Sequence, residues 1–214
     1  MKKGILCLLL VLTAGVLSAQ TDEAAVKLLT KVSSVYKNST GTELKIKITI
    51  DDSKTNLHQS AAGLLKTQGR KFMLQSDMAT LIFDGKDLYS YNKQSNEVTI
   101  SQPEDEELDE VDPTSIMNQY KTGYKIDKPE NQTIGNRPVS VIKLYPEDRS
   151  QEFFKVEIYI YTDNYQPYKI ITYSKNGVQN TITIEKSTLN QKFAADTFVF
   201  DAKKYPNVQI IDIR

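Results

Sequence analysis

The side chains that could perform catalysis are few in this 214-residue chain, which has one histidine, His58, and one cysteine, Cys7. Hydrolases with a Ser-His-Asp or Cys-His nucleophile need a base held beside the nucleophile. His58 stands in a polar turn with no such motif around it, so we interpret it as a surface residue. One cysteine and one histidine also exclude a Cys₂His₂ site within the chain. The sequence thus predicts no catalytic residue of these kinds and no metal site.

A second possible chemistry uses paired carboxyl groups, as in glycoside hydrolysis, where the two acids must differ in pKa. The acidic residues gather in the run from Glu104 to Asp112, which lacks apolar surroundings that would separate their pKa values. We interpret this run as a solvated loop, with an acidic docking site as the alternative. No glycine-rich phosphate-binding motif occurs in the sequence. We therefore expect no enzyme and no cofactor.

Charge and composition narrow the class of protein further. Lys+Arg and Asp+Glu number 27 each, so the chain has no net charge and a pI near 6.6. Nucleic acid binding needs a basic surface, and this balance argues against it. A hydrophobic content of 39% with 25% charged residues fits a soluble globular protein, and 12 Tyr with 7 Phe and no Trp favour strands.

Residues 1–19 are predicted to be a secretory signal peptide. Lys2 and Lys3 give a basic start, an apolar run extends from Ile5 to Leu17, and Ala19 offers a small residue for cleavage. An N-terminal membrane anchor is the alternative, but the run is too short to span a bilayer comfortably. We therefore expect a protein exported to the periplasm, not an integral membrane protein.

Residues 20–214 show no repeat, low-complexity linker or composition shift and are expected to form a single domain. Cys7 lies inside the apolar run and lacks the residues that usually precede a lipid-attachment cysteine, so we expect no lipid anchor. The mature chain then has no cysteine, and a hydrophobic core alone has to hold it together.

Two helices are expected among many strands. From Asp22 to Lys37, apolar residues recur at spacings of three and four, and Asp22 can act as the N-cap. A cap residue followed by proline at Asp112-Pro113 predicts a second, short helix through Tyr120.

The rest of the sequence is typical of short strands separated by turns. Leu44 to Ile50 alternates strictly between apolar and polar residues, which gives one aliphatic face. Asn176-Gly177 predicts a hairpin turn of type I′. Further strands are expected at Gln59–Lys66, Lys71–Asp77, Thr80–Phe83, Leu88–Tyr91, Glu97–Ser101, Tyr124–Asp127, Val139–Tyr145, Phe153–Tyr161, Tyr168–Ser174, Val178–Lys186, Phe198–Phe200 and Val208–Ile213.

These elements predict a mainly β (α+β) fold, a single curved antiparallel unclosed β-barrel of about eleven strands with a helical lid. Short connections favour antiparallel pairing, and a sheet of this size curls rather than staying flat. With aliphatic side chains on the inner face, the curl encloses an apolar interior. That interior is either a packed core or a cavity for an apolar ligand, and the sequence leaves both open.

Four segments resemble the outer-membrane lipoprotein carrier (LolA) family. Ala24–Tyr36 is similar to its opening helix, and Gly63–Leu74 to a pair of its strands. Thr80–Tyr91 resembles its hairpin, in which an apolar strand, Asp-Gly and an aromatic strand follow one another. Phe198–Asp212 resembles its closing segment of an aromatic strand, a proline turn and a final aliphatic strand. The likeness spans most of the mature chain.

The resemblance implies a soluble periplasmic carrier that shelters the acyl chains of lipoproteins in a hydrophobic cavity. Its partners would be acylated lipoproteins or lipid, an inner-membrane lipoprotein-releasing transporter and an outer-membrane receptor, and we expect a monomer. The absence of a lipid-attachment cysteine after the signal peptide favours the carrier over the membrane-held receptor, which shares the fold. The family commonly has an Arg-Pro pair that fastens the lid, whereas this chain has Arg70 nearby with no proline after it.

The alternating strands supply candidate cavity residues, although a shift of one residue in a strand would turn its set outward, and each position could be plain core. The cavity candidates are Ile46, Ile48, Ile50, Leu65, Phe72, Leu74, Leu81, Phe83, Leu88, Ile158, Ile160 and Ile170. The lid candidates are Leu28, Val32, Val35, Ile116, Met117 and Arg70. A periplasmic lipid or glycolipid binder, or a sensor module with a packed interior, would use the same scaffold without lipoprotein transfer.

Overall fold

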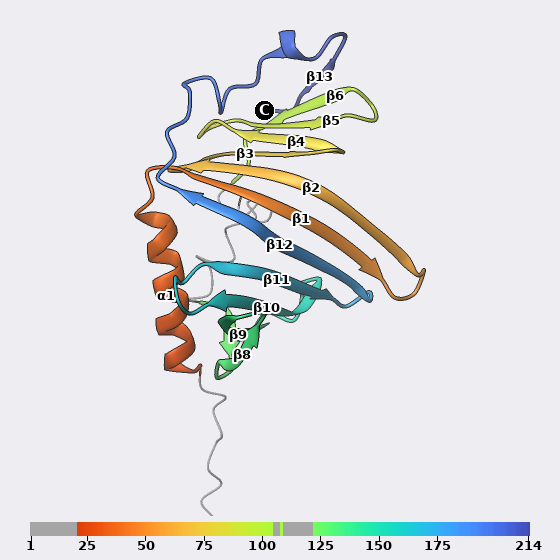
Figure 1. Ribbon diagram of the computed structural model, residues 1–214. Coiled ribbons are helices and arrows are strands. Elements are labelled where there is room, and N and C mark those ends of the chain that lie inside the picture. Colours follow the sequence, from red (N-terminus) through yellow and green to blue (C-terminus); the bar gives the residue numbers. More distant parts are fainter. Residues whose placement is uncertain (1–20, 105–107, 109–121) are drawn as a thin grey trace, which may run out of the picture.

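The computed structural model describes residues 21–104, 108 and 122–214 (Figure 1). The predicted signal peptide, Cys7 and most of the acidic run lie outside the described residues. So do the predicted second helix and, with it, the lid candidates Ile116 and Met117.

The described part of the chain is mainly β, as predicted, with one α-helix and one short 3₁₀-helix. In chain order the elements are α1 (Glu23–Lys37), β1 (Thr42–Asp52), β2 (Leu57–Gln68), β3 (Lys71–Ser76), β4 (Ala79–Phe83), β5 (Leu88–Asn92), β6 (Glu97–Ser101), β7 (Tyr124–Ile126), β8 (Glu130–Ile134), β9 (Arg137–Pro146), β10 (Phe153–Tyr161), β11 (Pro167–Ser174), β12 (Val178–Leu189), η1 (Ala202–Lys204) and β13 (Gln209–Asp212).

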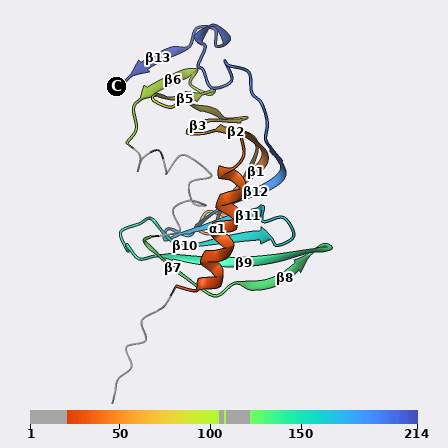
Figure 2. The ribbon, with the colours of Figure 1, turned by 90° about the vertical axis from the view of Figure 1, so that its left-hand side faces the viewer.

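All the strands belong to one 13-stranded sheet in the order β13-β6-β5-β4-β3-β2-β1-β12-β11-β10-β9-β7, with β8 also paired to β9. The sheet curves strongly, and α1 lies across one of its faces (Figures 1 and 2). β13 and the β7–β8 side do not pair with each other, so the barrel stays unclosed. The predicted curved, unclosed antiparallel architecture is confirmed.

The structure differs from the prediction at both ends of the sheet. β13 runs parallel to β6, because it returns after a long segment instead of a tight turn. β8 was not predicted, since its sequence Glu-Asn-Gln-Thr-Ile has almost no apolar residue, and all but Ile134 are exposed. β13 corresponds to the strand predicted at Val208–Ile213, so β8 is the strand of the sheet that the sequence did not indicate.

Two local predictions were wrong. Phe198 ends a turn, and Val199 and Phe200 are irregular backbone instead of strand. Phe198 is buried with its ring edge-on to Phe193, at 5.5 Å between centroids. In the β11–β12 hairpin only Gly177 of the Asn-Gly pair has a positive φ, of 97°, which excludes type I′. The Asn176 side chain instead accepts a hydrogen bond from the Val178 amide at 3.0 Å.

The cap and the apolar spacing of α1 explain why it forms where the sequence predicts. The Asp22 side chain accepts hydrogen bonds from the amides of Ala24 and Ala25 at 2.9 and 3.0 Å. The Asp22 amide donates to the carbonyl oxygen of Ile126 at 3.1 Å, which ties the start of the helix to β7. The N-terminal end of α1 is therefore fixed at one edge of the sheet.

Candidate functional site

The concave face, defined here as the sheet face on which α1 packs, is lined by aliphatic side chains from strands far apart in the sequence. Antiparallel register places Ile142, Ile158, Ile170, Ile182 and Ile48 side by side across β9, β10, β11, β12 and β1. Side chains alternate between the two faces of a strand, and residues opposite one another on neighbouring strands share a face. The face of one residue therefore determines the faces of the residues paired with it.

A second aliphatic row crosses the other half of the sheet on the same face. Leu44 of β1 stands opposite Leu65, which stands opposite Leu74, and Leu74 opposite Leu81. Phe72, Phe83 and Leu88 form a further row, and the rings of Phe72 and Phe83 lie 5.8 Å apart. By strand alternation, all the cavity candidates lie on the concave face.

Burial divides these candidates into two groups. Eight are enclosed: Ile46, Leu65, Phe72, Phe83, Leu88, Ile158, Ile160 and Ile170 are each at most 6% exposed. Ile48, Ile50, Leu74 and Leu81 are only half-buried, and so is Ile182, which was not predicted. We call these five residues the half-buried stretch.

Several concave-face residues were missed from the sequence. Ile182 and Ile184 could have been found, because Thr181 to Ile184 alternates strictly between polar and apolar residues. Ile142 and Leu144 could not be assigned to a face, because β9 also carries the buried Val139 and Val141 on its opposite face. A strand that is apolar on both sides has no period-two signal.

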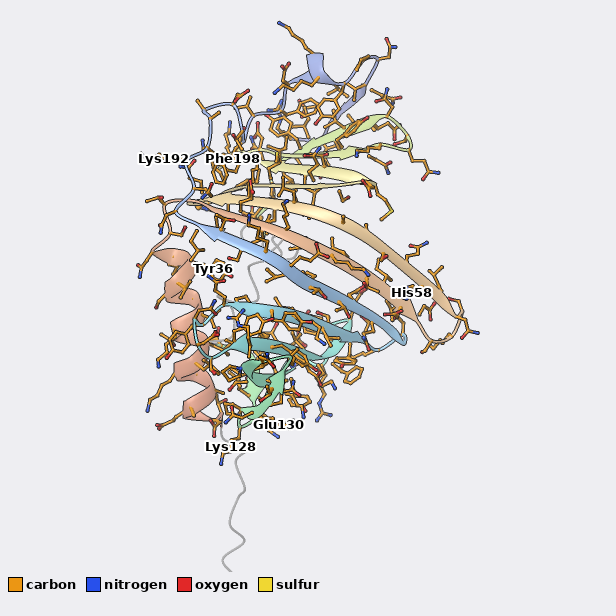
Figure 3. All side chains as sticks on the ribbon, viewed as in Figure 1. Tyr36, His58, Lys128, Glu130, Lys192 and Phe198 are labelled. Carbon is orange, nitrogen blue, oxygen red and sulfur yellow. The ribbon has the colours of Figure 1, made fainter. Side chains whose placement is uncertain are left out.

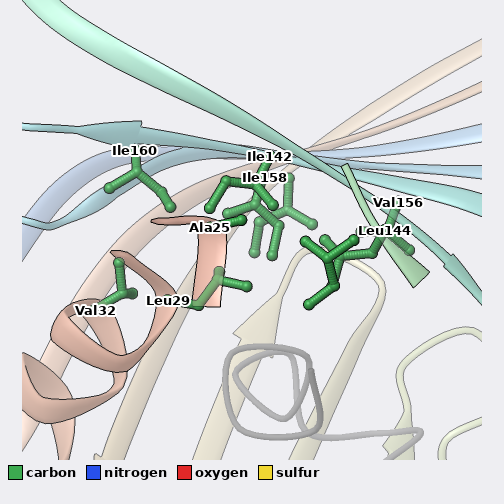
Figure 4. Close-up of a cluster of buried hydrophobic side chains, with 10 residues drawn as sticks. Ala25, Leu29, Val32, Ile142, Leu144, Val156, Ile158 and Ile160 are labelled. Atoms are coloured by element: carbon green, nitrogen blue, oxygen red, sulfur yellow. The ribbon is translucent and has the colours of Figure 1, made fainter. Parts of the chain in front are cut away.

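The helix cluster consists of the buried side chains that α1 packs with the β7–β11 half of the concave face (Figure 4). Ala25, Leu29 and Val32 are fully enclosed, whereas the lid candidates Leu28 and Val35 are only half-buried. The buried positions follow spacings of four and three along the helix. The members of the cluster are Ala25, Leu29, Val32, Ile126, Ile142, Leu144, Val156, Ile158, Ile160 and Ile170.

The strand cluster fills the β1–β5 half of the same face. Tyr36, in the last turn of α1, packs against both clusters and therefore marks the boundary between them. The members of the strand cluster are Leu44, Ile46, Leu65, Phe72, Phe83, Leu88, Leu108 and Ile184.

Two hydroxyl groups are enclosed at this boundary. Tyr36 extends from α1 toward the sheet (Figure 3), and Ser187 of β12 stands opposite Leu44 on the concave face. Burial raises the pKa of Tyr36 to about 12, and the nearby Ser187 hydroxyl offsets part of this rise. Among the described residues, neither buried hydroxyl has a partner in hydrogen-bond geometry.

The remaining lid candidate and the single histidine lie away from these clusters. Arg70 is exposed in the turn between β2 and β3, at the end of the sheet where β1 begins. His58 is exposed near the far end of β2 (Figure 3), with Nδ1 2.5 Å from Oδ1 of Asp51. The pair belongs to the exposed tip of the β1–β2 hairpin.

The convex face, which is the sheet face opposite α1, carries a buried carboxylate, Glu157, in the β9–β12 half of the sheet. The Glu157 carboxylate accepts hydrogen bonds from Lys155 Nζ at 2.8 Å and from the hydroxyls of Tyr159 and Tyr173 at 3.1 Å each. Burial opposes ionisation, but these hydrogen bonds hold the pKa of Glu157 below its ordinary value. Burial and the neighbouring Glu157 raise the pKa of Tyr173 to about 12. Both carboxylate oxygens of Glu157 accept hydrogen bonds within the protein, which is typical of a structural network.

The C-terminal segment covers the convex face at the other half. The Phe200 ring stacks on Tyr89 and Tyr205, with centroids 5.3 and 5.2 Å apart. Nη1 of Arg214 lies 2.6 Å from Oδ2 of the buried Asp87. A pocket of about 330 Å³ near the end of β3 has a mixed lining of charged, polar and apolar residues, and Ile46 is the one cavity candidate among them.

Across residues 21–104, 108 and 122–214, no group of three or more His, Cys, Asp or Glu side chains could hold a metal ion. In the same residues, no helix combines the length and the hydropathy that crossing a bilayer requires.

Several solved structures are similar to this chain at low sequence identity. An uncharacterised conserved protein from Thermus thermophilus superposes with a TM-score of 0.59 at 13% identity, over 89% of this chain and 99% of that one. A DUF1329 family protein from Desulfovibrio piger gives 0.50 at 8% identity, over 85% and 98%. A LolA superfamily protein from Nitrosomonas europaea gives 0.44 at 14% identity, over 83% and 98%.

No curated protein matches this sequence significantly. Residues 16–172, well over half of the chain, match the family described as outer membrane lipoprotein carrier protein LolA. The match includes α1, the strands β1 to β10 and most of β11, so it covers most of both apolar clusters. The chain therefore belongs to the outer membrane lipoprotein carrier protein LolA family.

Proposed function

We propose that this protein binds the acyl chains of lipoproteins or lipids on its concave face and carries them through the periplasm, from the inner toward the outer membrane. Its family, the outer membrane lipoprotein carriers, supports this role. The protein would act as a carrier, not an enzyme. It would receive cargo from an inner-membrane transporter and deliver it to an outer-membrane receptor.

The half-buried stretch is the observation that carries the proposal. Ile182 and Ile48 continue the row of Ile142, Ile158 and Ile170 across β12 and β1, and Ile50 follows Ile48 on the same face of β1. Ile48, Ile182, Leu74 and Leu81 all pack against the strand cluster. Each buried CH₂ group contributes about 0.8 kcal/mol, so sheltering one long acyl chain stabilises it by on the order of 10 kcal/mol. An aliphatic surface continuous with a packed core offers that shelter.

Leu74 and Met73 provide a matched test, since they are adjacent in β3, both half-buried and on opposite faces. We expect Leu74→Gln to weaken uptake of a fluorescent acyl probe by roughly tenfold, because a buried leucine contributes about 1.5–3 kcal/mol of apolar contact. Met73→Gln should leave uptake unchanged. Thermal unfolding of both variants checks that they fold. Equal probe affinities for the two variants would refute binding on the concave face.

The cargo distinguishes lipoprotein transfer from simple lipid binding on the same scaffold. Protein purified from its native periplasm should release acylated peptides into an organic extract, which mass spectrometry identifies. Glycolipid or phospholipid alone would support the lipid-binding alternative. No lipid, together with no uptake of the acyl probe, would contradict both.

A further inference from the structure

The enclosed hydroxyls of Tyr36 and Ser187 have no function in the fold described so far. Buried polar side-chain atoms nearly always have hydrogen-bond partners, so an unpaired one points to a missing ligand or to strain. These two are the buried side-chain oxygen or nitrogen atoms without a partner in the described part of the chain. They also lie near one another, since Ser187 affects the pKa of Tyr36.

Their position connects them to the proposed acyl-binding surface. Tyr36 packs against both the helix cluster and the strand cluster. Ser187 stands opposite Leu44, in the row that continues through Leu65 to the half-buried Leu74. The two hydroxyls thus lie where the helix cluster and the strand cluster meet, among aliphatic side chains.

The hydrogen-bonding capacity of the two hydroxyls indicates which kind of ligand they would bind. Burial raises the pKa of Tyr36 to about 12, so its hydroxyl keeps its proton at neutral pH and can donate, as can the hydroxyl of Ser187. A carbonyl oxygen has two lone pairs and can accept from both. The aliphatic surroundings disfavour a charged carboxylate or phosphate, which would lose its hydration there.

We propose that Tyr36 and Ser187 together bind the ester or amide carbonyl that joins an acyl chain to its carrier molecule. This inference rests on the proposed function and adds a polar anchor to it. Because both oxygens are enclosed, binding of the carbonyl requires the last turn of α1 to move away from β12. The hydrogen bonds then fix how deep the acyl chain lies and separate acyl esters from plain hydrocarbons.

Two probes test the anchor: a pyrene-labelled alkane and the methyl ester of the matching pyrene-labelled fatty acid. The wild-type protein should bind the ester more tightly than the alkane. Tyr36→Phe and, independently, Ser187→Ala should each weaken ester binding by about fivefold, as expected for one hydrogen bond, and leave alkane binding unchanged. Tyr124→Phe is the matched control, since Tyr124 also packs against the helix cluster, and it should change neither affinity.

The outcomes separate the anchor from the function on which it rests. If the alkane binds and neither Tyr36→Phe nor Ser187→Ala changes the ratio of ester to alkane affinity, the anchor is refuted and acyl binding stands. Equal weakening of both probes would assign the two residues to packing and likewise refute the anchor. If the wild-type protein binds neither probe, the proposed function fails together with the anchor.

Discussion

At the scale of single residues, the buried polar groups on the two sides of the sheet differ in whether they have hydrogen-bond partners. On the convex face, Glu157 is buried but receives hydrogen bonds from Lys155, Tyr159 and Tyr173. On the concave face, Tyr36 and Ser187 are enclosed without such partners. A satisfied buried network stabilises the fold, whereas unpaired hydroxyls cost free energy unless a ligand pairs with them.

The pH dependence of stability should reveal the Glu157 network. Its pKa lies below the ordinary value of 4.5, so its contribution is present above that pH and is lost as pH falls through the folded-state pKa. We expect Glu157→Gln to lower the free energy of unfolding by about 1–3 kcal/mol at neutral pH. The difference from wild type should shrink below pH 4.5 in urea unfolding series. Glu185→Gln, at an exposed position, is the control, and a difference independent of pH would contradict the assignment.

At the scale of elements, α1 is both a lid over the concave face and part of its core. The sequence predicts the helix and its cap correctly, but the phase of its buried stripe depends on the strands it meets. Leu29 is fully enclosed, while Leu28 is half-buried. A helix rotated by one residue would have satisfied the same apolar spacing almost as well.

Leu29 and Leu28 therefore offer a test of how α1 is seated. Leu29→Ala should lower the free energy of unfolding by about 2–5 kcal/mol, because it leaves a cavity in the helix cluster. Leu28→Ala removes the same atoms from a half-buried position and should cost clearly less. Denaturant unfolding of the two variants gives the comparison. A larger loss for Leu28→Ala would mean that α1 sits in a different rotation.

At the scale of the whole molecule, the C-terminal segment completes one end of the sheet. β13 pairs with β6, and Ile213 donates its amide to the carbonyl oxygen of Ile100 at 2.9 Å. Without β13, the edge of β6 would present unpaired backbone groups. The segment therefore protects an edge in addition to covering the convex face.

Deleting residues 209–214 should lower the unfolding temperature and promote association, because it exposes the edge of β6. Size-exclusion chromatography with light scattering measures the association. Arg214→Gln is the control, since it removes the ion pairs of Arg214 with Asp87 and Asp212 but leaves the backbone pairing of β13 with β6 in place. A deleted form that stays monomeric and equally stable would contradict this role.

Local sequence determined much of this protein. Strict alternation predicted the two faces of β1, and the cap at Asp22 predicted the start of α1. The series of short strands predicted the curved sheet. These features depend on residues that are close together in the sequence. Tertiary structure alone decided the parallel pairing of β13, the turn at Phe198, the sealing of some aliphatic side chains by α1, and the meeting of Tyr36 with Ser187. Those features depend on pairing and packing between distant segments, which no local pattern encodes.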